Sequence, residues 1–81
     1  MNNKITLDAL PTKDYRSLVG NCIRTFRERK GYSQDELANL MKINRSTISK
    51  IESGKFALSI DYLERLSVHL NFELILKPNN K

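Results

Sequence analysis

Hydrogen-bonding and cationic side chains follow one another in the middle of the chain, and they are the residues best suited to chemistry. They are Arg45, Ser46, Thr47, Ser49 and Lys50. Their hydroxyl groups could act as nucleophiles, but no histidine is predicted near them to take the proton. On the outer face of a short helix, close to its N-terminus, the same side chains suit phosphate groups and base edges. The pattern favours nucleic-acid binding; the alternative is a helical hairpin with a merely solvated face.

Two short helices joined by a tight turn are predicted to present this face. The first begins after Ser33, whose hydroxyl can accept a hydrogen bond from the Glu36 amide while the Glu36 carboxylate reaches back to the Ser33 amide. Leu37, Ala38 and Met41 then recur at helical spacing and form its inner stripe. Ala38 is small where two helices must approach each other closely.

The second short helix is predicted between Asn44 and Gly54. Asn44 is a residue type that caps helix N-termini, and Gly54 suits the left-handed conformation that ends helices. Ile48 and Ile51 stand three residues apart and therefore share its inner face. The polar residues listed above are left on its outer face.

This pair of helices resembles the helix-turn-helix of the phage repressor and Cro class, also called the XRE class. The likeness covers roughly residues 18 to 77. It includes Val19-Gly20, Ile23-Arg24, Arg27, Tyr32-Ser33-Gln34, Ile51-Glu52-Ser53-Gly54-Lys55 and Ser59 to Leu70. The motifs are short, but their joint spacing is highly specific. The resemblance implies an all-α fold, a compact lambda-repressor-like bundle of four to five helices with a short C-terminal β-strand. It also implies that the second helix of the pair enters the DNA major groove.

The same resemblance implies roles for single residues. Gln34 would touch a phosphate and brace the recognition helix, and Arg45 and Ser46 would lie nearest the bases. Arg27 would bridge to Glu52 as a structural pair. The candidate DNA-binding residues are Gln34, Asn44, Arg45, Ser46, Thr47, Ser49, Lys50 and Lys55.

One residue departs from the family pattern. Lys42 stands at the turn position that glycine usually holds. A non-glycine residue in the left-handed conformation costs about 1–2 kcal/mol. Two outcomes therefore stay open: Lys42 accepts that strain, or the turn is shaped differently here.

Length, charge and cysteine content narrow the class of protein further. Eighty-one residues with a formal charge of +5 make one small domain that suits a polyanionic partner, although a merely soluble basic protein would share this balance. A single cysteine cannot form an internal disulfide, and no segment has the layout of a signal peptide. No apolar run approaches the roughly 18 residues that span a bilayer. We expect a cytoplasmic protein with no membrane association.

Metal, cofactor and catalytic sites are not expected. The chain holds one cysteine, Cys22, and one histidine, His69, which cannot build a zinc site. It has no glycine-rich phosphate-binding loop. Cys22 is interpreted as a small buried hydrophobe, and His69 suits the negative end of its helix. We therefore predict no cofactor and no enzymatic activity.

The chain divides into four predicted segments around this motif. They are an N-terminal segment at 1–11, flexible or a short strand; the helix-turn-helix domain at 12–70; a dimerisation strand at 71–78; and a tail at 79–81. The first helix of the domain is predicted to start near Thr12 or Asp14 and to end at Lys30, before Gly31.

The C-terminal segment alternates like a strand, and its predicted dimerisation residues are Phe72, Leu74, Ile75 and Leu76. A lone strand leaves backbone groups unpaired, so it needs a partner strand. The segment resembles the tail of HipB-type antitoxins, in which strands of two subunits pair, and this arrangement is favoured. The alternative is a hairpin within the chain that uses Ile5 and Leu7.

The leading hypothesis is a dimeric, sequence-specific transcriptional regulator that binds a palindromic operator on double-stranded DNA, most simply a repressor. Its favoured subclass is the autoregulating antitoxin of a toxin–antitoxin pair, which would add a toxin protein as partner. One alternative is a protein-interaction module that mainly neutralises or holds a partner protein. The other is a phage or restriction-modification controller.

Overall fold

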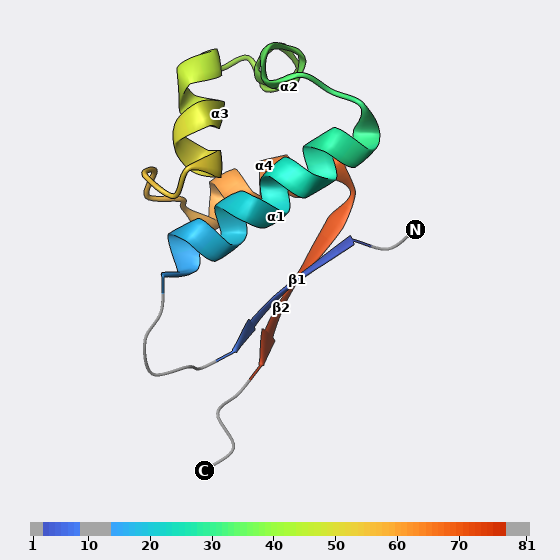
Figure 1. Cartoon of the computed structure of the whole chain (residues 1–81). Coiled ribbons are helices and arrows are strands. Elements are labelled where there is room, and N and C mark those ends of the chain that lie inside the picture. The colour runs from blue at the N-terminus through green and yellow to red at the C-terminus, as the bar shows by residue number, and fades with distance from the viewer. Residues whose placement is uncertain (1–2, 9–13, 78–81) are drawn as a thin grey trace.

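Four helices and two short strands make up the computed structural model, which describes residues 3–8 and 14–77. In chain order they are β1 (Asn3–Asp8), α1 (Tyr15–Lys30), α2 (Gln34–Met41), α3 (Arg45–Glu52), α4 (Ile60–Leu70) and β2 (Phe72–Lys77) (Figure 1). The predicted tail at 79–81 and a helix start at Thr12 fall outside the described residues. The four-helix bundle confirms the predicted fold class, to which β1 adds a second short strand.

The ends of α1 lie at residues suited to helix termini. The Asp14 carboxylate accepts hydrogen bonds from the Ser17 hydroxyl at 2.7 Å and the Ser17 amide at 3.1 Å, and these bonds lower the pKa of Asp14. Gly31 ends the helix with a φ of 79°, a conformation that glycine adopts without steric cost. Between these ends, Ile23 and Phe26 are buried in the core.

The start of α2 and the turn after it follow from local hydrogen bonding. The Glu36 amide donates to the Ser33 hydroxyl at 3.0 Å and the Ser33 amide donates to the Glu36 carboxylate at 2.7 Å, which confirms the predicted capping box. Lys42 has a φ of 58°, so of the two outcomes left open, it accepts the left-handed conformation. The turn is completed by the Ile43 amide, which donates to the Ala38 carbonyl at 3.0 Å.

The ends of α3 differ in two details from the prediction. Asn44 occupies the N-cap position, but its side chain makes no capping hydrogen bond. The helix reaches its C-cap at Ser53, and Gly54 follows it with a φ of 78°. A Cβ atom at Gly54 would meet Ser17 of α1. Glycine is therefore needed there both for its backbone conformation and for the close approach of two segments.

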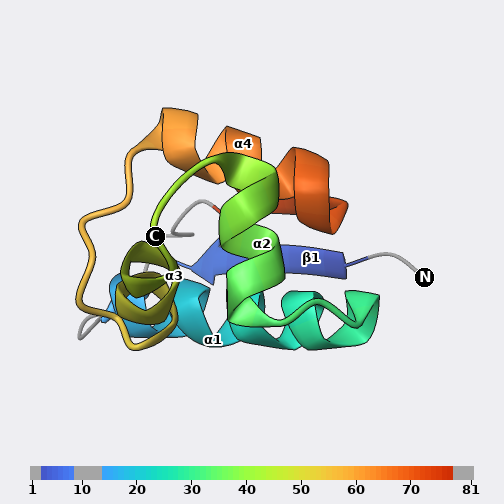
Figure 2. The ribbon, with the colours of Figure 1, turned by 90° about the horizontal axis from the view of Figure 1, so that it is seen from above.

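The hydrophobic core lies where the four helices meet. α1 packs against α3 and α4, and α2 packs against the same two helices (Figure 2). Ile23, Leu37, Ile48 and Leu66 are fully buried there. Gly20 has no room for a side chain, because a Cβ atom would meet backbone atoms at the C-terminal end of α3. α1 and the end of α3 are thus in direct backbone contact, the close packing that a glycine inside a helix suggests.

The two strands pair with each other within the chain. Ser59 caps the start of α4 by accepting from the Tyr62 amide at 3.0 Å, and Asn71, with a φ of 58°, ends α4 and leads directly into β2. β1 and β2 are parallel, with Ile5 opposite Leu74 (Figure 1). Parallel strands need a long crossover between them, and here the whole helical bundle forms that crossover.

This pairing corrects the sequence-based interpretation of the C-terminal strand. The sequence favoured pairing with a second copy, and its alternative was a hairpin within the chain that uses Ile5 and Leu7. The structure pairs β2 with β1 of the same chain through these residues, but the two strands are parallel. Phe72 is buried, with its ring centroid 5.3 Å from that of Phe26, so it belongs to the core of one chain. Leu74 and Ile75 are half-buried, and Leu76 is exposed.

Candidate nucleic-acid interface

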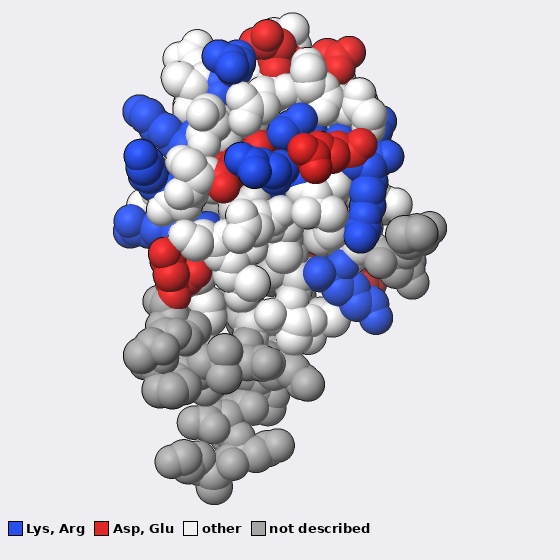
Figure 3. All heavy atoms as spheres, viewed as in Figure 1, with Lys and Arg blue, Asp and Glu red and all other residues white. Residues whose placement is uncertain are grey.

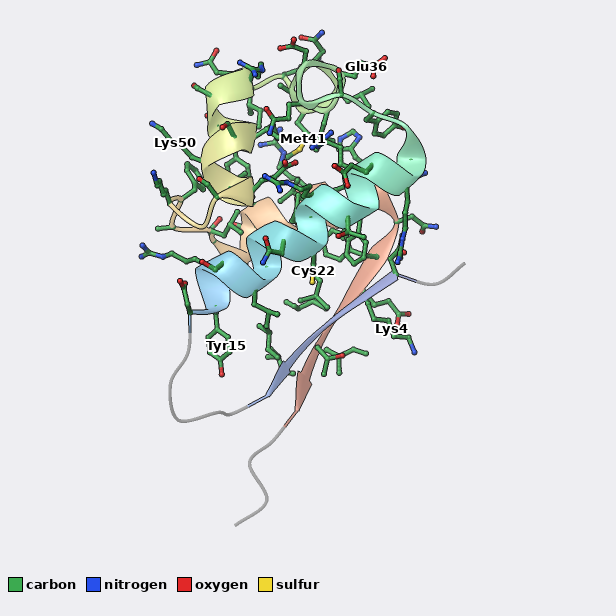
Figure 4. The ribbon with its side chains drawn as sticks, in the orientation of Figure 1. Lys4, Tyr15, Cys22, Glu36, Met41 and Lys50 are labelled. Carbon is green, nitrogen blue, oxygen red and sulfur yellow. The ribbon has the colours of Figure 1, made fainter. Side chains whose placement is uncertain are left out.

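α3 has one buried face and one polar face. Ile48 and Ile51 are buried against the core, whereas Arg45, Ser46, Ser49 and Lys50 are exposed and Thr47 is half-buried. In Figure 4, Lys50 points away from the helical body on the outer side of α3. Figure 3 shows Lys and Arg side chains gathered along the edge of the molecule that α3 forms. The outer face of α3 therefore offers hydroxyl and cationic donors to a polyanion.

Arg45, the first residue of α3, has a weakly held side chain. Its Nε atom lies 3.8 Å from Oδ1 of Asp35, and the two side chains are 63% and 72% exposed. An ion pair this exposed contributes between zero and about 1 kcal/mol, because water and salt screen it. Arg45 can therefore exchange this contact for a base edge or a phosphate at little cost.

Arg27 and Glu52, expected as a structural pair, meet below the polar face. Arg27 Nε donates to Glu52 Oε2 at 2.6 Å and Arg27 Nη2 donates to Glu52 Oε1 at 3.0 Å. Arg27 Nη1 also donates to the Tyr32 carbonyl at 2.9 Å. The hydrogen bond to Glu52 raises the pKa of Arg27, which keeps the Arg27 guanidinium charged. This bidentate contact ties α1 to the C-terminal end of α3.

Gln34 brings α2 into the same cluster. Its Nε2 atom donates to Glu52 Oε1 at 3.0 Å, and its side chain is half-buried. The carboxylate of Glu52, the last residue of α3, thus receives donors from the first residue of α2 and from the last turn of α1. The angle between α2 and α3 is held from beneath by this carboxylate.

The remaining candidates lie at the ends of α3. Asn44 is exposed just before the helix, and Lys55 is exposed just after it, where its amide donates to the Lys50 carbonyl at 2.9 Å. The structure therefore brings seven of the eight candidate DNA-binding residues together along α3 and its two ends, and Gln34 joins them through the Glu52 carboxylate.

Two arginines of this region were not among the candidates. Arg24 Nε lies 3.6 Å from Glu52 Oε1. Its position three residues before Arg27 places both on neighbouring faces of one helix, a signal that the sequence contained. Arg65 Nη2 donates to the Met41 carbonyl at 2.5 Å and braces the end of α2 from α4. No sequence signal points to that bond, because its acceptor is a backbone carbonyl on another helix.

Cys22 and His69 were not expected to form a metal site or a catalytic site. Cys22 is half-buried, and burial raises the pKa of its thiol, which favours the unreactive protonated form. His69 is half-buried as well. Within residues 3–8 and 14–77, no three histidine, cysteine or acidic residues are grouped to hold a metal ion. Over the same residues, no helix has the length and apolar character of a membrane span.

A short helix with an exposed polar face, held at a set angle to the preceding helix by buried hydrogen bonds, defines a helix-turn-helix DNA-binding protein. The chain belongs to the helix-turn-helix family of the XRE and Cro type, whose family model matches residues 23–76. The protein is therefore a transcriptional regulator that binds DNA through this motif, and the family is non-enzymatic.

Relatives agree with this assignment. The chain is 33% identical to the Neisseria hypothetical transcription factor of Neisseria meningitidis serogroup B, over 100% of this chain and 81% of that protein. It is 40% identical to the HTH-type transcriptional regulator SlrR of Bacillus subtilis over 70% of this chain, but it spans only 38% of that longer protein.

Solved structures show the same fold. The restriction-modification controller protein C.AhdI from Aeromonas hydrophila superposes with a TM-score of 0.69 at 30% identity, covering 75% of this chain and 92% of that chain. The hypothetical transcription factor NHTF from Neisseria superposes with a TM-score of 0.67 at 27% identity, covering 84% of this chain and 80% of that chain.

Proposed function

We propose that the protein is a dimeric, sequence-specific repressor that places α3 in the major groove of a palindromic operator. The observation that carries this proposal is the polar face of α3, which is exposed while its opposite face is anchored through Ile48, Ile51 and Glu52. A helix that is anchored on one face and exposes donors on the other suits sequence reading, because bases are distinguished by donor and acceptor positions in the major groove.

The proposed contacts fall into two groups. Arg45 and Ser46, in the first turn of α3, would contact base edges, and Ser49 and Lys50 would continue that row one turn later. Phosphate contacts would come from Thr47 within α3 and from Gln34, Asn44 and Lys55 outside it. Phosphate contacts position the protein and base contacts specify the site, so the two groups should respond differently to a change of DNA sequence.

Dimerisation is supported by apolar side chains that one chain leaves exposed. Ile60 and Val68 of α4 and Leu76 of β2 are 68%, 75% and 69% exposed. β2 pairs on one edge with β1, and its other edge meets no strand among the described residues. A small domain with such a surface often gains stability by covering it with a second copy. The retained dimerisation candidates are Leu74, Ile75 and Leu76, without the buried Phe72.

Fewer observations support a particular subclass of regulator than support DNA binding itself. The antitoxin prediction was inferred from the resemblance of the C-terminal strand to the tail of HipB-type antitoxins. Because β2 pairs with β1 of the same chain, the pairing of strands between two subunits lends it no support, and this subclass stays a prediction. The controller alternative has the fold similarity to C.AhdI in its favour. Finding a restriction-modification gene pair beside this gene would support a controller, whereas a toxin gene there would support an antitoxin.

The proposal is tested by DNA binding of the wild-type chain and an Arg45→Ala variant. The probes are a duplex selected from a random pool, the DNA upstream of the gene, and a scrambled duplex, each followed by fluorescence anisotropy. We expect Arg45→Ala to weaken binding to the selected duplex by about 1–3 kcal/mol. Its effect on binding to the scrambled duplex should be much smaller.

The matched control is Arg29→Ala, which removes the same charge from a different place. Arg29 lies on α1, and its Nη1 donates to the Asn3 side chain of β1 at 2.8 Å, away from α3. It should lower affinity for both duplexes alike and only slightly. Equal losses for the two variants on both duplexes would contradict base reading by Arg45. A selection that yields no preferred sequence would contradict the proposed function itself.

A further inference from the structure

We propose that Arg24 of α1 binds a DNA backbone phosphate beside Gln34, which adds a third helix to the interface. This inference rests on the DNA-binding function proposed above. It is carried by the position of Arg24, whose Nε atom lies 3.6 Å from Oε1 of Glu52. The same oxygen accepts the hydrogen bond from Gln34 Nε2 at 3.0 Å.

This shared oxygen places Arg24 close to the proposed contact surface. Two nitrogens that approach one carboxylate oxygen at 3.6 and 3.0 Å can be no farther apart than the sum of these two distances. Gln34 opens α2 and is one of the proposed phosphate contacts. Arg24 therefore lies near the DNA backbone when Gln34 does, although it belongs to a helix that the sequence-based interpretation left out of the interface.

Glu52 does not need Arg24 as a partner. Its two oxygens already accept from Arg27 at 2.6 and 3.0 Å and from Gln34 at 3.0 Å. The 3.6 Å separation from Arg24 is too long for a hydrogen bond. The Arg24 side chain is 54% exposed, against 11% for Arg27. Arg27 is thus committed to the buried carboxylate, and the donors of Arg24 remain directed to a hydrated surface.

The two arginines of the cluster lie close together on α1. Both approach the carboxylate of Glu52, and Glu28 places a second carboxylate near Arg27. Like charges three residues apart on a helix repel each other. A phosphate next to Arg24 would offset that repulsion, and the planar guanidinium can bind two phosphate oxygens at once. Glu52 would then act as a positioning residue that holds Arg24 toward the DNA.

The test measures anisotropy binding of the wild type, Arg24→Gln, Arg24→Lys and Arg29→Gln to the selected duplex and to the scrambled duplex across a KCl series. Arg29→Gln is the matched control, since it removes the same charge from the same helix, on the side that contacts β1. For Arg24→Gln we expect an equal fold-loss on both duplexes and a salt slope reduced by about 1. Arg24→Lys should keep most of the slope, because the charge remains.

Three results would overturn this inference alone, provided that the wild type selects a preferred duplex. Arg24→Gln could match Arg29→Gln in affinity and in the salt slope of binding. The effect of Arg24→Gln would then come only from the loss of one net charge. Arg24→Gln could weaken only the selected duplex, which would make Arg24 a base contact. It could lose its thermal unfolding transition while Arg24→Lys binds no better than Arg24→Gln, which would make its role structural. A wild-type chain that selects no duplex would instead contradict the underlying function.

Discussion

Two of the arginine–carboxylate pairs that join the helices differ in depth and in distance. Arg27 and Glu52 form a bidentate pair at 2.6 and 3.0 Å with both side chains nearly buried. Arg45 and Asp35 stand 3.8 Å apart and are mostly exposed. The first pair connects α1 with the end of α3, and the second connects the start of α2 with the start of α3.

Because the two pairs differ in burial, they contribute differently to the stability of the fold. A buried carboxylate without its partner is costly, because no water replaces the lost donors. An exposed pair loses almost nothing when it opens, because water solvates both groups. The deep pair therefore holds α3 in place, and the shallow pair leaves Arg45 available to DNA. One motif thus separates the charges that build it from the charge that we propose to read its target.

The strongest test of this comparison removes the deep carboxylate. Glu52→Ala leaves the Arg27 guanidinium buried without an anion, and we expect a loss of about 3–5 kcal/mol in the free energy of unfolding. Urea unfolding followed by circular dichroism measures this loss. The double variant Arg27→Met, Glu52→Leu is the control, and it should recover much of the stability because it replaces the charges by apolar volume. A loss below about 1 kcal/mol for Glu52→Ala would show that the deep pair does not hold the fold.

A smaller effect on the free energy of unfolding is expected from the turn between α2 and α3. Lys42 adopts a φ of 58° there, a conformation that costs a residue other than glycine about 1–2 kcal/mol. We expect Lys42→Gly to raise the free energy of unfolding by roughly 1 kcal/mol, after the greater chain entropy of glycine is subtracted. Lys42→Ala is the control, since it removes the charge but keeps the strain. Equal stability of the two variants would mean that strain at this turn is negligible.

The smallest effect is expected from the shallow pair. Asp35→Asn removes the carboxylate beside Arg45, and we expect the free energy of unfolding to change by no more than about 0.5 kcal/mol. Thermal unfolding at low and at high salt measures this change. A loss above 1 kcal/mol that disappears at high salt would show that the exposed pair has a structural role and would remove the contrast between the two pairs.

Much of the fold could be predicted from the sequence because the patterns that indicate it are local. The capping box of Ser33 and Glu36 and the helix end at Gly31 depend on residues within one turn of each other. The inner faces of α2 and α3 follow from helical periodicity, which needs no knowledge of the partner. The polar face of α3 was predicted for the same reason, as the side of the helix that periodicity leaves outside.

The pairing of the two strands could not be predicted from local sequence patterns. An alternating pattern predicts that residues 72–77 form a strand, but it does not state the partner or the direction of pairing. Ile5 lies opposite Leu74 because the bundle between β1 and β2 brings the two ends of the chain together in parallel. That arrangement depends on the packing of all four helices, which no short window of sequence contains.

The sequence by itself determined the end of α1, the start of α2, the buried stripes and the donor-rich face of α3, because each depends on neighbours along one helix. Only the tertiary structure decided that Glu52 receives donors from α1 and α2 together, that Arg24 stays exposed beside it, and that β1 pairs with β2. Those contacts join residues distant along the chain, and their distances and burial exist only after the helices have packed.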